Sequence, residues 1–109
     1  MAVSTLTLAS RLHMQINGLI TALDVDIIGR ETGKTLNRIK LTSNDARLDV
    51  RDWEMADNKS EMDTHARSGL KRYEALRADI LKASESGVFG SIDVIDLSAQ
   101  IDTIQAELV

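Results

Sequence analysis

Residues 91–109 read SIDVIDLSAQIDTIQAELV, and this stretch decides the fold. Apolar residues recur in it at alternating steps of three and four, which places them along one side of a helix. The stretch contains no Lys or Arg. A short helix of this kind is marginal alone, so the sequence predicts a packing partner for the apolar side. We call that side the C-terminal seam, and it consists of Val94, Leu97, Ile101, Ile104 and Leu108.

The preceding segment, residues 64–82, has a complementary character. It reads THARSGLKRYEALRADILK and is basic, with an apolar seam of its own formed by Leu70, Tyr73, Leu76 and Ile80. In an antiparallel pair, the position numbers of facing residues sum to a constant. A sum near 174 opposes the two seams and also the charged pairs Arg67–Glu107, Lys71–Asp102 and Lys82–Asp93. Because only a short Gly-containing stretch separates the segments, we predict a C-terminal αα-hairpin. An intermolecular coiled coil would use the same seams.

The N-terminal part predicts a first helix from about residue 5 to residue 28. Gly18 lies inside this helix, where glycine costs about 1 kcal/mol relative to alanine. Two interpretations follow: a close crossing of another helix, or a tolerated glycine. Gly29 and Gly33 interrupt the pattern. The apolar stripe of this helix consists of Leu8, Leu12, Ile16, Leu19, Leu23 and Ile27.

Residues 36–53 allow two interpretations. Over residues 45–51, charged and apolar residues alternate with period two, which is typical of a half-buried strand in a β-hairpin. The same segment can form a helix capped by Ser43 or Asn44, with Trp53 as a core anchor. We favour the helix, because the surrounding segments are helical and an isolated hairpin is marginal. The predicted fold is an all-α, small antiparallel bundle of three or four helices, with a β-hairpin at 36–53 as the alternative.

Local signals set the ends of the last two helices. Residues 60–63 fit a capping box, and Asp63 can itself serve as the cap of the first of them. That helix is expected to reach about Ser86, with Gly87 as its stop. Ser91 is expected to be the N-cap of the last helix.

Composition and charge limit the class of protein. The chain of 109 residues fits a single helical domain, 1–109, and has no proline to interrupt long helices. It has no cysteine, which excludes disulfides and thiolate metal sites and agrees with a cytoplasmic location. The N-terminus has no signal-peptide pattern, and the most apolar window, residues 16–28, is too short and too charged to span a membrane. The net charge of −4 is laid out in blocks of alternating sign, which indicates an acidic protein whose segments pair with each other or with copies of themselves.

One segment approaches a phosphate-binding motif. Residues 29–35 read GRETGKT, one residue shorter than the GxxxxGK[ST] loop that wraps its backbone N–H groups around a phosphate. We regard it as a Gly-rich connection, with a degenerate nucleotide binder as an alternative. The two histidines, His13 and His65, lie far apart in the sequence and belong to no metal-binding pattern. With no nucleophile motif either, we predict no enzyme activity, no cofactor and no metal site.

The function predicted from these patterns is a non-enzymatic helical protein–protein interaction module. This class covers an adaptor, an assembly subunit, a chaperone or an inhibitor, and it acts through an apolar helix face on another protein or on a second copy of itself. The candidate face is the C-terminal seam, and the stripe of the first helix is the second choice. The alternative is a nucleic-acid-binding protein that uses the basic 64–82 helix, with Arg67, Lys71 and Arg72 as the patch, although the acidic remainder of the chain argues against it.

Overall fold

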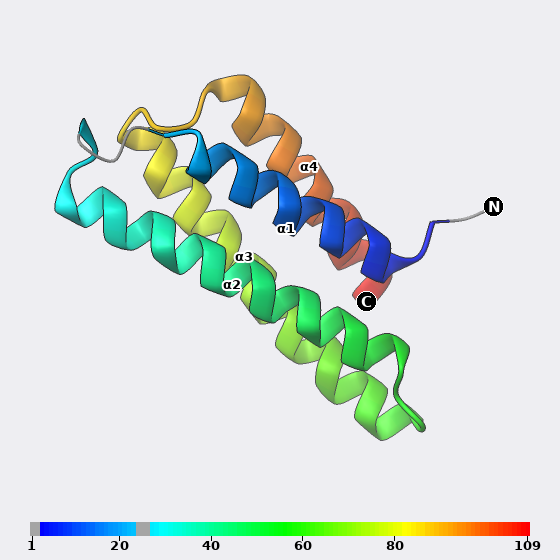
Figure 1. Cartoon of the computed structure of the whole chain (residues 1–109). Coiled ribbons are helices and arrows are strands. Elements are labelled where there is room, and N and C mark those ends of the chain that lie inside the picture. Colours follow the sequence, from blue (N-terminus) through cyan, green and yellow to red (C-terminus); the bar gives the residue numbers. More distant parts are fainter. Residues whose placement is uncertain (1–2, 24–26) are drawn as a thin grey trace.

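The protein folds as an antiparallel bundle of four helices, and no strand occurs in the part of the chain that is described (Figure 1). The computed structural model describes residues 3–23 and 27–109. Each helix contacts the next one along the chain, and α1 also contacts α4, which closes the ring. The all-α prediction is confirmed, and the β-hairpin alternative at 36–53 is wrong. The helices are α1 (Thr5–Thr21), α2 (Arg30–Glu54), α3 (Lys59–Glu85) and α4 (Ser91–Leu108).

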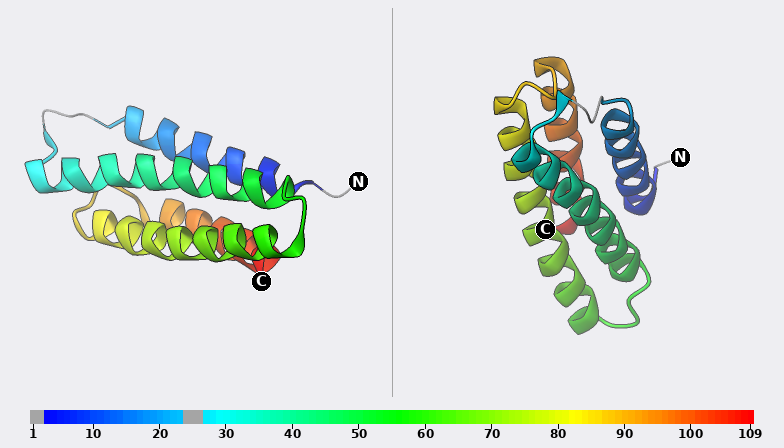
Figure 2. Two further views of the ribbon diagram at one scale, coloured as in Figure 1. Left: turned by 90° about the horizontal axis from the view of Figure 1, so that it is seen from below. Right: turned by 60° about the vertical axis from the view of Figure 1, so that its left-hand side comes forward.

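The two long helices form the backbone of the bundle. α2 and α3 share its most extensive interface and project past α1 and α4 at one end, as Figure 1 and the right-hand view of Figure 2 show. α1 and α4 share the least extensive interface of the four neighbouring pairs. The bundle therefore has a long, well-packed half and a shorter half in which two helices meet only lightly.

α2 runs without interruption through the segment whose pattern was ambiguous. The period-two alternation arises because a carboxylate, Asp49, lies on the buried side of the helix between α2 and α3. Asp49 accepts hydrogen bonds from the Ser68 hydroxyl at 3.0 Å and from the Arg72 guanidinium at 2.7 Å. The predicted cap at Ser43 or Asn44 is wrong, because Gly29 is the N-cap and Ser43 is buried inside the helix.

α1 is shorter than predicted and ends at Thr21. Its stripe does face the core as far as Leu23, but Ile27 is 82% exposed. The part of the predicted helix over residues 24–26 lies outside the described residues. Gly18 is exposed, and no described heavy atom comes within 4 Å of the position that a Cβ would take, so no helix crosses there. Gly18 is a tolerated glycine.

The capping predictions are partly right. Gly87 follows the end of α3 with φ 81°, the left-handed conformation that glycine adopts without strain. α3 begins earlier than predicted: Asn58 accepts from the Glu61 N–H at 2.9 Å, and the Glu61 carboxylate accepts from the Asp57 N–H at 3.3 Å. At α4, the cap is Gly90, and Ser91 is the first helical residue.

The predicted αα-hairpin is present as α3 and α4, but its register is different. A Cβ at Gly69 would stand 3.1 Å from Leu108 Cδ1, so these two positions face each other. Their numbers sum to 177, which moves the pairing by three residues from the predicted sum of 174. The reason is that Gly69, and not the half-buried Leu70, faces the core and allows α4 to approach.

The charged contacts between α3 and α4 differ accordingly. Arg77 bonds Asp102, and it also donates to the Gln105 side chain at 2.8 Å. None of the three predicted pairs, Arg67–Glu107, Lys71–Asp102 and Lys82–Asp93, occurs among the described residues. The other basic residues of α3 that form ion pairs do not use α4, since Arg72 binds α2 through Asp49.

Candidate interaction surface

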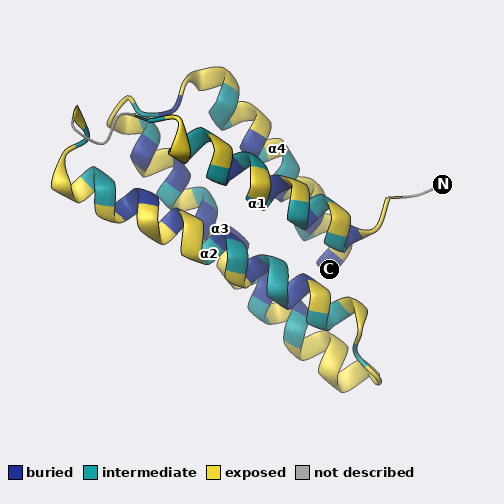
Figure 3. Ribbon diagram, in the orientation of Figure 1, coloured by how far each residue is buried: buried dark blue, intermediate teal, exposed yellow. Residues whose placement is uncertain are grey.

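The C-terminal seam lies in the interior of the bundle. Leu97, Ile101 and Ile104 are 0% exposed, Leu108 is 4% exposed, and Val94 is half-buried against the same core. Figure 3 shows this buried side of α4 turned toward the other helices. The stripe of α1, the second choice, is also turned inward. Apart from Ile27, the described residues of both stripes are buried or half-buried within the bundle, so neither stripe offers a partner an open apolar face.

The basic patch of α3 is only partly available. Arg67 and Lys71 are exposed on the surface. Arg72 instead donates to Asp49, and this ion pair holds α3 against α2. Arg38 on α2 binds Asp79 of α3 through two hydrogen bonds of 2.9 Å, and this bonding raises the pKa of Arg38. Two of the positive charges of this half, Arg38 and Arg72, therefore join the two long helices.

The segment that approaches a phosphate-binding motif is helical. Residues 30–35 form the first turns of α2, where Lys34 lies 3.6 Å from the Glu31 carboxylate and the Thr35 hydroxyl donates to the Glu31 carbonyl at 3.2 Å. These residues do not form a loop that could wrap around a phosphate. A shallow hollow of about 300 Å³ lies beside them, between the ends of α1 and α2. Its described lining is Ile20, Ile28, Gly29, Arg30, Gly33, Leu36, Asn37 and Lys40.

The histidines lie apart, and no group of three or more potential metal ligands occurs within residues 3–23 and 27–109. His13 links α1 to α2 in a chain of hydrogen bonds. The Ser43 hydroxyl donates to the Lys40 carbonyl at 3.0 Å, so its oxygen accepts from His13 Nδ1 at 2.6 Å. His13 Nε2 is then the acceptor for the Asn17 amide at 3.2 Å. Burial, and then the positive charges of Arg47 and Lys40, lower the pKa of His13, which favours this neutral form.

Charge is distributed very unevenly over the four helices. α1 contains one charged residue, Arg11, and the charges of α4 are four carboxylates without a single Lys or Arg. α2 and α3 carry most of the remaining charged residues of the chain. Interface cores are depleted in charged residues relative to the rest of a protein surface. α1 has this character, whereas α4 exposes Asp96, Asp102 and Glu107.

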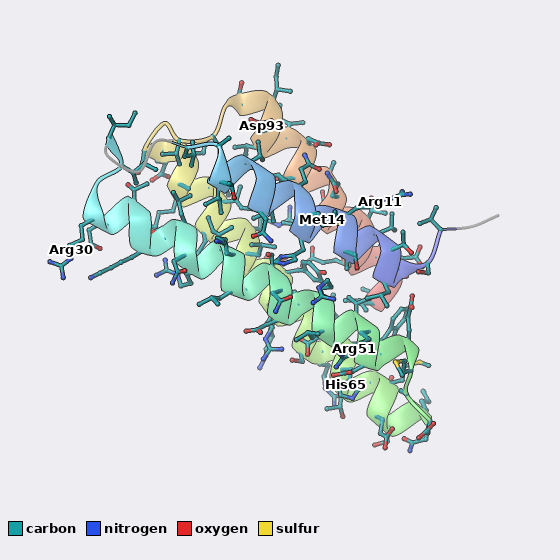
Figure 4. All side chains as sticks on the ribbon, in the orientation of Figure 1. Arg11, Met14, Arg30, Arg51, His65 and Asp93 are labelled. Atoms are coloured by element: carbon teal, nitrogen blue, oxygen red, sulfur yellow. The ribbon has the colours of Figure 1, made fainter. Side chains whose placement is uncertain are left out.

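A set of exposed residues on the outer sides of the adjacent helices α1 and α4 forms what we call the α1–α4 face. On α1, exposed residues recur at steps of four and three, opposite the buried ones. On α4, the exposed apolar and uncharged members of the face recur at similar steps, and the exposed carboxylates Asp96, Asp102 and Glu107 lie beside them. Met14 is 71% exposed, Ile92 81% and Ile95 69%, and the other members are small or polar except Arg11. Figure 4 shows Arg11 and Met14 on α1 beside α4. The face consists of Thr7, Arg11, Met14, Gly18 and Thr21 on α1, and Ile92, Ile95, Ala99, Thr103 and Ala106 on α4.

The two helices are joined beside this face by polar contacts, one of them exposed and one partly buried. Gln15 donates to the Asp96 carboxylate at 2.6 Å and accepts from the Gln100 amide at 2.7 Å. These bonds fix the relative height of the two helices. Side chains of the face on α1 and α4 therefore have defined positions relative to each other. This holds although α1 and α4 pack on each other less extensively than the other neighbouring helices do.

Sequence reasoning missed this face although the signal was present. Ile92 and Ile95 lie outside the C-terminal seam, so α4 is apolar on two sides. An amphipathic helix that only covers a core has a polar outer side. The second apolar side of α4 and the nearly uncharged sequence of α1 are therefore the two sequence features that could have indicated the α1–α4 face.

No protein-family model matches the chain, and no significant similarity to a curated protein or to a solved structure was found. Among the described residues, no helix combines the length and the apolar character needed to cross a membrane.

Proposed function

We propose that this protein is a non-enzymatic, cytoplasmic interaction module that binds a protein partner through the α1–α4 face. The observation that carries the proposal is the exposure of Met14, Ile92 and Ile95 on two adjacent helices, the first of which has Arg11 as its single charged residue. The exposed charges of α4 are the carboxylates Asp96, Asp102 and Glu107. Single exposed apolar residues are ordinary on protein surfaces, whereas a group of them on one face is typical of a binding site.

The remainder of the bundle acts as a scaffold for this face. Buried apolar residues from all four helices form one core, and ion pairs tie α2 to α3 and α3 to α4. In this arrangement, α2 and α3 support α1 and α4, whose outer sides face the partner. A helical module of this kind needs no bound cofactor to act, because recognition comes from the shape and polarity of the face.

The experiment uses single-cysteine variants, since the chain contains no cysteine. A photo-crosslinker is attached at Ile95→Cys, and the matched control carries it at Leu81→Cys, an exposed position (47%) on α3. After illumination in an extract of the cells that make the protein, we expect a partner that is captured at 95 and not at 81. The partner is identified by mass spectrometry, purified, and titrated against the protein and its Met14→Glu variant.

Two results would contradict the proposal. One is capture of the same proteins at positions 95 and 81, which indicates nonspecific contact. The other is a purified partner that binds Met14→Glu as tightly as the unaltered protein. Loss of binding on Met14→Glu, with an unchanged far-ultraviolet circular dichroism spectrum, is the expected result, because Met14 is exposed and its replacement does not disturb the core.

A further inference from the structure

We infer that the partner of the α1–α4 face is a second copy of this chain, docked by a two-fold axis that runs parallel to the helices. The inference rests on the proposed function of that face and names its occupant. With this axis, α1 of one copy lies on α4 of the other, and α4 of the first lies on α1 of the second. Both copies use the same surface, as an isologous dimer requires.

The register within one chain supports this arrangement. Gln15 bonds both Asp96 and Gln100, so it stands level with residue 98, and facing positions of α1 and α4 sum to 113. A two-fold axis parallel to the helices leaves height unchanged, so the same sum applies between copies. It brings Met14 over the partner copy's Ala99, and Ile95 over the partner copy's Gly18. The exposed large residues of each helix thus meet small residues of the other.

The charges favour the same axis. α4 bears four carboxylates and no positive charge, whereas α1 bears Arg11 and no negative charge. At a sum of 113, Arg11 stands level with the partner copy's Asp102, whose side chain is 66% exposed even though Arg77 binds it. A two-fold axis across the helices would instead place α4 on α4, with like charges opposed. Such like-charge contacts act against a wrong docking geometry.

The size of the face indicates a weak dimer. A helix of 17 residues is about 25 Å long, and two adjacent helices are about 20 Å wide, so each copy buries about 500 Å². The total of about 1,000 Å² is near the lower limit for a specific interface. We therefore expect a dimer that forms and dissociates with concentration.

The test has two steps with the purified full chain. Sedimentation velocity from about 1 µM to about 1 mM is expected to show a reversible monomer–dimer equilibrium. Ile95→Asp is expected to abolish the dimer, while the matched control Leu41→Asp, at a 60% exposed position on α2, leaves the dimer intact. Single-cysteine proteins then report the axis: Met14→Cys mixed with Ala99→Cys is expected to give a disulfide-linked heterodimer, and Met14→Cys alone little homodimer.

Each result is decisive. A monomer at every concentration, or a dimer that persists in Ile95→Asp, overturns the inference. Cross-linking of Met14→Cys to itself in preference to Ala99→Cys overturns the axis. If the protein is monomeric but the crosslinker at position 95 captures a different protein, the inference fails and the proposed function stands. If the protein is monomeric and the crosslinker captures nothing, both the inference and the proposed function fail.

Discussion

Gly69 is the position at which the α3–α4 register can be tested most directly. A Cβ there would stand 3.1 Å from Leu108 Cδ1 and 3.5 Å from Asp49 Cβ. Carbon atoms in favourable contact are about 3.5–4.0 Å apart, so Gly69→Ala forces Leu108 to move. Gly18→Ala provides the matched control, because both glycines lie inside helices and the Cβ at 18 meets nothing within 4 Å among the described residues.

The magnitudes follow from two opposing effects. Replacing a helical glycine by alanine stabilises a protein by about 0.5–1 kcal/mol when the Cβ is unobstructed. Crowding a packed core costs about 1–3 kcal/mol. Gly18→Ala should therefore raise the free energy of unfolding by about 1 kcal/mol, and Gly69→Ala should leave it unchanged or lower it by up to about 2 kcal/mol. The difference corresponds to a separation of about 4 °C or more in Tm.

Urea unfolding followed by the fluorescence of Trp53, the only tryptophan, measures both variants. A low protein concentration keeps the chain monomeric. The double variant Gly69→Ala, Leu108→Ala separates crowding from other effects: without Leu108 Cδ1, the alanine at 69 should show its full benefit relative to Leu108→Ala alone. If Gly69→Ala stabilises the unaltered protein as much as Gly18→Ala does, Gly69 does not face Leu108 and the register is wrong.

Four further predictions concern three polar groups that are buried or partly buried. The folded-state pKa of His13 lies below its ordinary 6.5, so the unfolded chain binds more protons at mildly acidic pH. The free energy of unfolding is therefore highest above about pH 6.5 and falls as the pH drops below it. In His13→Gln, the urea midpoints at about pH 5.5 and about pH 7.5 should differ less than they do in the unaltered protein. An equal slope in both proteins would contradict this. Tyr73 is 1% exposed and its hydroxyl has no partner among the described atoms, so Tyr73→Phe should raise the free energy of unfolding by about 1 kcal/mol, and a loss of stability would reveal a partner. Burial and then Asp49 raise the pKa of Tyr73, so its absorbance should not show ionisation in alkali before the protein unfolds. Asp49→Ala should lower the free energy of unfolding in urea by about 1–3 kcal/mol. The control Asp52→Ala, which breaks an exposed pair with Arg51, should lower it by about 1 kcal/mol or less. Similar losses in the two variants would show that the Asp49–Arg72 pair does not stabilise the α2–α3 interface.

Helix type and the αα-hairpin were predictable from the sequence because both depend on local periodicity. The apolar residues of α4 at steps of three and four indicate one helix side without knowledge of the partner. Register was not predictable in the same way. It depends on which residue of α3 lets α4 approach, and a glycine such as Gly69 gives no apolar signal even though it lies at the contact.

The ambiguity at residues 36–53 has a different cause. Asp49 is polar but turned into the α2–α3 interface, where Arg72 and Ser68 bind it. Assigning a secondary structure from alternating apolar and charged residues assumes that charged residues face the solvent. A buried carboxylate violates that assumption, and its partners, 19 and 23 residues away, cannot be identified from spacing alone. The hairpin interpretation was wrong for this reason.

The sequence placed the candidate face on a side of α4 that is buried in the bundle, for a related reason. An apolar helix side can cover a core or bind a partner, and periodicity does not distinguish the two. The structure does, because α4 has two such sides and its neighbours cover only one of them. The side that remains, with Ile92 and Ile95, lies next to the only helix with a single charge. If a four-helix bundle needed α1 and α4 only to close its core, their outer sides would gain solubility from charges like those on α2 and α3. Apart from Arg11, α1 lacks such charges, whereas α4 keeps exposed carboxylates. The proposal of a protein contact therefore rests on the nearly uncharged α1 next to the exposed Ile92 and Ile95 of α4.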